Sequence, residues 1–214
     1  MAAGECFDED NFCLLCDKIA SKDEDLKLII TQFGYPPFWS RPASFETLVH
    51  IILEQQVSLA SALAALNKLK LSVEDISAAK ILLLTDDALK SCYFSRQKII
   101  YVKHLAAEIL DGKLILDDLY AMDDDQVLHQ LTKIKGIGTW SASVYLMMVL
   151  HRIDIFPLGD VALLTSVRET KGLLKETSKS GIETIAEEWK PLRTIASFIL
   201  WHGYLCRRKR EYFK

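Results

Sequence analysis

The chain has 214 residues, of which half are apolar and 26% are charged, and its formal net charge is −3. A chain of this length makes one or two domains, and this apolar content can bury a core, which excludes disordered and fibrous proteins. The apolar runs are too short to span a bilayer and the first residues form no signal peptide, which excludes membrane-spanning and secreted proteins.

The spacing of apolar residues, caps and helix breakers predicts an all-α protein. A capping box at 21–24 opens the first helix, which Gly34 closes, and prolines keep 35–42 out of helix. A long helix over 44–70 follows, then N-caps at Thr85 and Ser95, a helix over 96–111 and another from Asp123 to about Lys133. The last helices are predicted over 139–152, from a capping box at 180–183, and from Pro191 in a first turn to about Cys206.

Charge is distributed unevenly along the chain. Residues 1–25 hold eight acidic and two basic residues, a net of −6, so the remainder carries +3. Three basic stretches lie in that remainder: Arg96 with Lys98 and Lys103, Lys133 with Lys135, and 207–210. Such stretches can attract a polyanion, although solvated helix faces show the same pattern.

The most informative segment is a glycine-containing turn between two predicted helices. Gly136 and Gly138 stand one residue apart, which allows a tight hairpin whose backbone can approach a ligand closely. The free amides at the start of the following helix make a phosphate site, although many ordinary helix–helix turns also contain glycine. Twenty residues after Trp140 comes Asp160, which can be a helix N-cap or a functional carboxylate.

Together these motifs resemble the helix-hairpin-helix (HhH-GPD) superfamily of DNA glycosylases. The superfamily signature is a hairpin of the form Leu-x-x-Ile-x-Gly-Ile-Gly, here at 131–138 within a motif of about 131–142, followed by an aspartate about twenty residues later. The segment 48–58 and the tail 189–193 with Trp201 are similar to the branch of bacterial 3-methyladenine-DNA glycosylase II. The resemblance covers about 44–205.

The resemblance implies a set of DNA-binding residues. In the family, hairpin amides contact a DNA phosphate, which assigns that role to Gly136 and Gly138, with Thr139, Lys133 and Lys135 beside them. Lys135 stands where the family usually has proline. Hairpin carbonyls hold a Na⁺ or K⁺ ion in the family, and the matching positions are Thr132, Ile134 and Ile137. In the family, a side chain from a turn in this region, here within the helix over 44–70, enters the gap that a flipped nucleotide leaves. We assign this role to Gln56, with Gln55 beside it as the second candidate. The alternative is that both glutamines only end a helix.

The resemblance also implies the chemistry. Asp160 matches the catalytic aspartate, and Trp140 and Trp201 match the base pocket, where indole faces attract a cationic methylated purine. Tyr145, next to Val144, is counted with this pocket. The branch has a tyrosine at the position of Val144, and these aromatic residues can also be ordinary core residues. Trp140 replaces the lysine with which bifunctional members form a Schiff base, so no lyase activity is expected. With only Cys206 in the tail, no iron–sulfur cluster is expected, and no cofactor is required.

The sequence therefore predicts a monofunctional glycosylase that removes alkylated purines such as 3-methyladenine and 7-methylguanine from double-stranded DNA. Alternatives are a glycosylase for another damaged or mispaired base, a non-catalytic DNA-binding hairpin module, and a helical adaptor between proteins. We expect two helical lobes with a DNA-binding cleft between them, one over 44–152 and one over 1–43 plus 153–214. Five irregularly spaced cysteines indicate a reducing compartment, so we expect a monomer in the bacterial cytoplasm or a nucleus.

Overall fold

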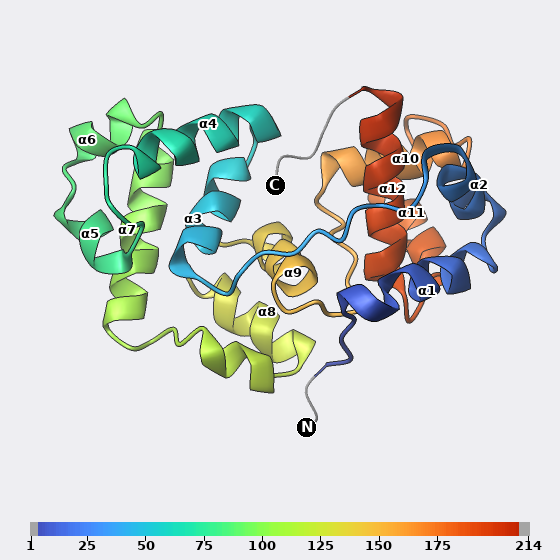
Figure 1. Cartoon of the computed structure of the whole chain (residues 1–214), viewed down its shortest axis with the longest axis horizontal. Coiled ribbons are helices and arrows are strands. Elements are labelled where there is room, and N and C mark those ends of the chain that lie inside the picture. The colour runs from blue at the N-terminus through green and yellow to red at the C-terminus, as the bar shows by residue number, and fades with distance from the viewer. Residues whose placement is uncertain (1–3, 210–214) are drawn as a thin grey trace. The chain divides into compact units, whose positions relative to one another are not determined.

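Helices are the main secondary structure of the part of the chain that the structure describes. The computed structural model describes residues 4–209, which form twelve α-helices and one 3-10 helix (Figure 1). Within those residues the pairing of extended backbone is limited to one isolated bridge, between Cys6 and Arg152. The prediction of an all-α protein is confirmed. None of the helices in this range is long and apolar enough to cross a membrane.

The chain divides into two compact units. Residues 41–145 form the continuous unit, and 4–40 with 146–209 form the split unit. The predicted boundaries lay at 43/44 and 152/153, whereas the second boundary falls inside a helix, at 145/146. All residues of 141–150 are buried, so this apolar run supplies core side chains to both units. The predicted cleft between two lobes stays a prediction.

The continuous unit is built around one central helix, α7 (Arg96–Leu110), which packs against α3, α5 and α6. Its buried face repeats at helical spacing through Ile99, Val102 and Leu105. The other elements are α3 (Phe45–Glu54), α4 (Leu59–Lys70), α5 (Ala78–Leu83), α6 (Asp86–Ser91), η1 (Asp117–Ala121), α8 (Asp124–Thr132) and the start of α9 (Thr139–Met148).

The split unit is built around α12 (Arg193–Arg207), against which α1 (Glu9–Ala20), α2 (Glu24–Phe33) and α10 (Val161–Thr170) pack. The remaining helix, α11 (Lys179–Glu187), packs on α10. Every residue of 194–201 is buried. The Phe198 ring anchors an aromatic cluster with centroids 5.3 to 5.9 Å from four other rings: Phe7, Phe12, Trp39 and Trp201.

Several predicted helix ends are confirmed and others are wrong. The hydroxyls of Thr85 and Ser95 accept N-cap bonds, and Asp123 forms a capping box. The predicted helix over 44–70 is two helices, because Gln56 adopts φ 57°, which no helical residue can hold, and Ser58 caps α4. Three predicted helix starts are wrong. The N-cap of α2 is Asp23 rather than Ser21, that of α11 is Ser178 rather than Ser180, and that of α12 is Leu192, so Pro191 precedes the helix. The helix predicted over 139–152 ends at Met148.

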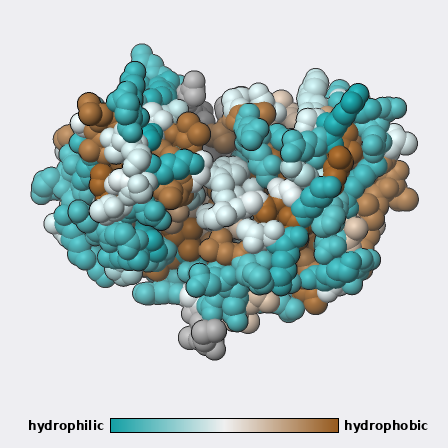
Figure 2. Space-filling model, turned by 180° about the vertical axis from the view of Figure 1, so that it is seen from behind, coloured by the Kyte–Doolittle hydropathy of each residue, from teal (hydrophilic) through white to brown (hydrophobic). Residues whose placement is uncertain are grey.

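Much of the charge noted in the sequence is paired inside the split unit. The Asp23 carboxylate accepts from Lys171 Nζ at 2.7 Å and from the indole Nε1 of Trp189 at 2.8 Å, so the acidic N-terminal region helps to hold this unit together. Arg207 and Arg208 form ion pairs with Glu169, which reduces the positive charge of the stretch 207–210. Arg210 lies outside the described residues. On the face drawn in Figure 2, hydrophilic residues predominate and hydrophobic ones form separate patches.

Candidate catalytic carboxylate and DNA-binding hairpin

The predicted hairpin lies between α8 and α9, and its two glycines have different constraints. Gly136 has φ +97°, and a Cβ there would lie 2.1 Å from Cγ of Tyr101 on α7. This glycine is therefore required by packing inside the continuous unit. A Cβ at Gly138 would meet no atom within 4 Å, and the residue is exposed. Nothing in the described structure requires glycine at 138, which is what we expect where a ligand approaches the backbone.

The hairpin is anchored by apolar side chains and presents polar groups at its surface. Ile134 and Ile137 are buried, and the Ile137 amide donates to the Ile134 carbonyl at 3.0 Å. The Gly138 carbonyl accepts from Ala142 N at 3.0 Å, so the amides of the first turn of α9 have no intrahelical acceptor. Three further side chains predicted to bind DNA are exposed around this turn: Lys133, Lys135 and Thr139. The hairpin thus offers amides and positive charge to an anion.

The predicted cation site falls on the same hairpin. Thr132 is the last residue of α8, and carbonyls at a helix C-terminus lack intrahelical donors and carry partial negative charge. The Ile134 carbonyl accepts one hydrogen bond and has a second lone pair, so that bond does not exclude a Na⁺ or K⁺ ion at the predicted carbonyls of Thr132, Ile134 and Ile137. Such an ion would stiffen the hairpin. The site stays a prediction.

The two adjacent glutamines have different surroundings. Gln55 is half-buried, and its Nε2 donates to the Gly136 carbonyl at 2.7 Å and to the Ser141 hydroxyl at 2.9 Å. Gln56 is exposed and adopts φ 57°. The structure therefore engages the Gln55 amide within the protein, whereas the Gln56 side chain is open to an external partner. Gln55 thus joins the turn to the hairpin, and contact of either glutamine with DNA stays a prediction.

The turn that bears Gln56 is fixed by charged side chains that sequence reasoning missed. The Arg41 guanidinium binds the Glu54 carboxylate at 3.0 and 2.6 Å, and both side chains are nearly buried. The pKa of His50, 3.6 Å from Glu54, is lowered by burial, so its imidazole is neutral at pH 7. Lys98 Nζ donates to the Leu53 carbonyl at 2.6 Å. A carboxylate within the apolar run of α3 was the signal in the sequence for the Arg41–Glu54 pair.

Asp160 lies in the split unit at the start of α10. Its Oδ1 accepts from the Leu163 amide at 2.7 Å, which is an N-cap bond, and from the indole Nε1 of Trp201 at 3.2 Å. Asp160 is therefore an N-cap, as one alternative predicted, and it also accepts a hydrogen bond from the Trp201 side chain. A carboxylate offers about four lone-pair sites, so an N-cap bond does not prevent it from acting on a substrate.

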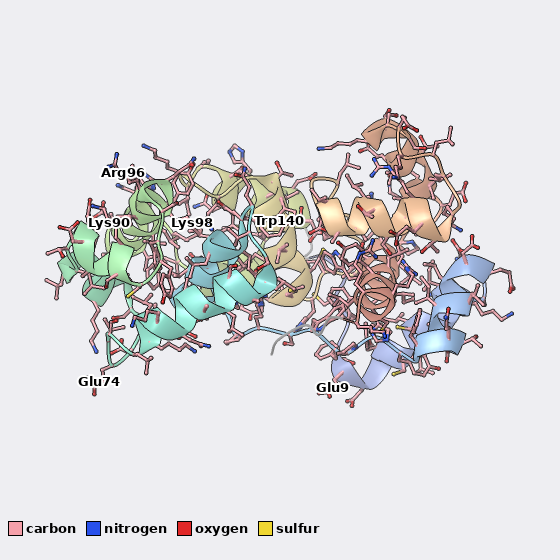
Figure 3. All side chains as sticks on the ribbon, turned by 90° about the horizontal axis from the view of Figure 1, so that it is seen from above. Glu9, Glu74, Lys90, Arg96, Lys98 and Trp140 are labelled. Carbon is pink, nitrogen blue, oxygen red and sulfur yellow. The ribbon has the colours of Figure 1, made fainter. Side chains whose placement is uncertain are left out.

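The three aromatic residues predicted to line a base pocket differ in exposure. Trp201 is 9% exposed, and its ring contacts Trp39 and Phe198, while Trp140 on α9 is half-buried (Figure 3). Tyr145 is 0% exposed, its hydroxyl has no partner among the described residues, and burial raises its pKa. The prediction that Tyr145 lines a base pocket is corrected: Tyr145 is a core residue, because α9 is buried on all sides over 141–148.

Comparisons with known proteins show the family of this chain. Residues 49–192 match the family model of HhH-GPD superfamily base excision DNA repair proteins. The chain belongs to this superfamily. It is 30% identical over 175 residues to the alkylbase DNA glycosidase-like protein mag2 of Schizosaccharomyces pombe, covering 79% of this chain and 82% of that protein.

Two further comparisons extend over almost the whole chain. This HhH-GPD protein is 28% identical over 209 residues to the DNA-3-methyladenine glycosylase of Bacillus subtilis, covering 92% of this chain and 69% of that enzyme. The structure of the 3-methyladenine DNA glycosylase Mag1 of S. pombe in complex with abasic DNA matches with a TM-score of 0.83. That match covers 94% of this chain and 98% of the Mag1 chain at 24% identity, and it shows a common fold.

Proposed function

We propose that this HhH-GPD protein is a monofunctional DNA glycosylase that removes alkylated purines from duplex DNA in base excision repair. The observation that carries the proposal is the Asp160 carboxylate, held at the start of α10 by the Leu163 amide and the Trp201 indole. Relatives named as DNA-3-methyladenine glycosylases, together with Mag1 in complex with abasic DNA, support the substrate class.

DNA binding is assigned to the continuous unit. The amides after Gly138 hold a backbone phosphate, and the exposed Lys133 and Lys135 add positive charge beside it. Chemistry on a stacked base requires the nucleotide to leave the duplex, at a cost of a few kcal/mol. Gln56, exposed on a turn that is fixed on several sides, fills the gap that the nucleotide leaves.

The chemical step is assigned to Asp160. As the bond from C1′ of the sugar to the base nitrogen breaks, the base departs with the electron pair and positive charge develops on the sugar. The Asp160 carboxylate stabilises that charge and orients the water that adds to C1′, as carboxylates do in glycoside hydrolysis, and the proton that the water loses passes to the carboxylate or to solvent. A purine alkylated at N3 or N7 is cationic and leaves as a neutral base, so the reaction needs no strong general acid.

The absence of strand cleavage follows from Trp140. An indole nitrogen is not a nucleophilic amine, so Trp140 cannot form a Schiff base with the opened sugar. The product is then an intact strand with an abasic site. We propose that the protein works as a monomer and without a catalytic cofactor in the compartment that contains the DNA.

The proposal is tested by base release from methylated duplex DNA. Wild-type protein is expected to release 3-methyladenine or 7-methylguanine and to leave sites that break only on heating or in alkali. A strand broken without treatment would contradict the monofunctional mechanism. DNA binding without release of any base from a panel of alkylated, deaminated and mispaired substrates would favour the non-catalytic hairpin module, in which Asp160 is only a cap.

A further inference from the structure

A strongly acidic surface lies on the continuous unit, where the chain passes from the end of α7 through η1 to the start of α8 (Figure 1). Residues 108–125 hold seven acidic residues and one lysine, a net charge of −6 in a chain whose net charge is −3. Lys113 pairs with two of these carboxylates, at 2.8 and 3.3 Å. Asp117, Asp118 and Asp125 are exposed, and no ion pair with another described residue compensates their charge. This negative charge is thus left for an external partner.

Three large apolar side chains of the same segment are open to solvent. Leu110 is 54% exposed, Ile115 is 51% exposed and Tyr120 is 49% exposed. Their neighbours Leu114 and Leu119 are buried and supply the core side chains of this segment, so the other three are not needed to fill the core. A single exposed apolar residue is ordinary, but several in one short segment among carboxylates are typical of a surface that contacts another molecule.

Hydrogen bonds hold the backbone of this surface in place. The Glu108 carbonyl accepts from the amides of Lys113 and Leu114 at 2.9 and 3.1 Å, which folds the chain back onto the end of α7. From α8, Gln130 Nε2 donates to the Lys113 carbonyl at 3.2 Å. The end of α7 and α8 are thereby joined through the segment between them. Since the surface is formed before a partner arrives, binding requires little further ordering of the backbone.

We propose that residues 108–125 form a docking surface for a basic segment of another protein, whose lysine or arginine side chains pair with the exposed carboxylates and whose apolar side chains pack on Leu110, Ile115 and Tyr120. Nucleic acid does not fit this surface, because phosphates would face carboxylates, whereas charges of opposite sign attract a basic partner and orient it. The surface is small for a protein interface, so the complex is weak and transient. The inference goes beyond base removal, since no residue assigned to DNA binding or to chemistry lies in 108–125.

Fluorescence anisotropy with two labelled synthetic peptides of equal charge tests the proposal. One peptide is amphipathic, with lysines on one face of a helix and leucines on the other, and in the second peptide serines replace the leucines. The full-length protein is expected to bind the leucine peptide at least about tenfold more tightly than the serine peptide, because only the first buries apolar surface. Binding is expected to weaken as salt is added, since exposed charges are screened. Failure of the leucine peptide to bind, or equal affinity for both peptides, would overturn the inference.

Matched variants locate the binding on this surface. Asp117→Asn combined with Asp118→Asn is expected to weaken binding of the leucine peptide about fivefold, whereas Glu183→Gln combined with Glu188→Gln removes the same charge from exposed positions of the split unit and is expected to weaken it less than about twofold. Ile115→Ser is expected to reduce the preference for the leucine peptide. Equal weakening by the two charge pairs would show general electrostatic attraction and overturn the inference.

Two further measurements separate this proposal from folding and from base removal. The melting temperature of each variant is expected to stay within a few degrees of wild type, because the substituted side chains are exposed. Base release from methylated DNA is expected to be unchanged in all of them. If wild type releases no base but binds the leucine peptide at 108–125, only the proposed function falls; if it releases bases and does not bind the peptide, only this inference falls.

Discussion

The Gln55 side-chain amide donates to the carbonyl oxygen of Gly136 at 2.7 Å, across 81 positions of the chain. A second bond, to the Ser141 hydroxyl at 2.9 Å, extends the link to the first turn of α9. The turn that exposes Gln56 and the hairpin that exposes Gly138 are therefore joined by one side chain within the continuous unit. Two regions proposed to hold DNA at different points are in this way kept at a fixed separation.

The two glutamines should respond differently to substitution. Gln55→Met removes both bonds and leaves the Gly136 carbonyl without this donor, so we expect a loss of about 1–3 kcal/mol in the free energy of unfolding. Gln56→Gly relieves a left-handed backbone and should leave stability unchanged or raise it by up to about 1 kcal/mol, while weakening base release. Denaturant unfolding and single-turnover kinetics measure both effects. Equal destabilisation by the two substitutions would contradict the separate roles.

The two hairpin glycines provide a second matched pair. Gly136→Ala places a Cβ against Tyr101 and should destabilise the protein by several kcal/mol, as overpacking combined with a positive φ does. Gly138→Ala meets no protein atom and should leave the melting temperature within a few degrees while weakening DNA binding about tenfold or more. Thermal unfolding and fluorescence anisotropy with labelled duplex give the two quantities. DNA affinity unchanged in Gly138→Ala would argue against phosphate binding at this hairpin.

The helical class and the hairpin could be predicted because both depend on local signals. Caps at Thr85, Ser95 and Asp123 need only a side chain and the amides three residues on. Within the helix expected over 44–70, the alternative that Gln55 and Gln56 end a helix is confirmed, since Gln55 is the C-cap of α3. The bond from Gln55 to Gly136 could not be predicted, because it spans 81 positions and periodicity does not encode it. Tyr145 was misassigned for the same reason: a tyrosine in an apolar run faces a pocket or a core according to tertiary packing.

The split unit should depend on pH through Asp23. Burial favours protonation of this carboxyl, but hydrogen bonds from Lys171, Trp189 and the Leu26 amide outweigh it, and the pKa is lowered below its ordinary value. Its stabilising contribution is therefore complete above the ordinary pKa of about 4 and is lost as the pH falls through the lower folded pKa. Unfolding free energies from pH 7 to 2 should fall more steeply in wild type than in Asp23→Asn. Parallel curves would show that the pKa of Asp23 is the same in the folded and unfolded states.

Trp201 is expected to act as a positioning residue for Asp160. Trp201→Phe keeps an aromatic ring against Trp39 and Phe198 but removes the Nε1 donor. We expect the single-turnover rate to fall about tenfold, with DNA affinity within about twofold of wild type. Trp201→His, which retains a ring N–H, should recover part of the rate if the hydrogen bond is responsible. A rate unchanged in Trp201→Phe would remove this role and leave Trp201 as a packing residue.

The polar residues of the candidate site could be predicted from the sequence, whereas most of the residues that hold them in place could not. Asp160 and the glycines are recognised by spacing along the chain, and the structure shows in addition which donor binds the aspartate. The Arg41–Glu54 pair was not identified, and Lys98 was noted only for its charge and not for its bond to the Leu53 carbonyl. These contacts are set by how α3 lies against α7 and the segment before it.

The most direct test of the account is the single-turnover rate of base release by Asp160→Asn. Asparagine caps a helix about as well as aspartate, so this substitution should keep α10, the melting temperature and DNA affinity close to those of wild type. Loss of the negative charge should lower the rate of release of 7-methylguanine about 100-fold or more. A rate within about threefold of wild type, with binding and stability retained, would show that Asp160 is a helix cap and that the chemistry takes place without it.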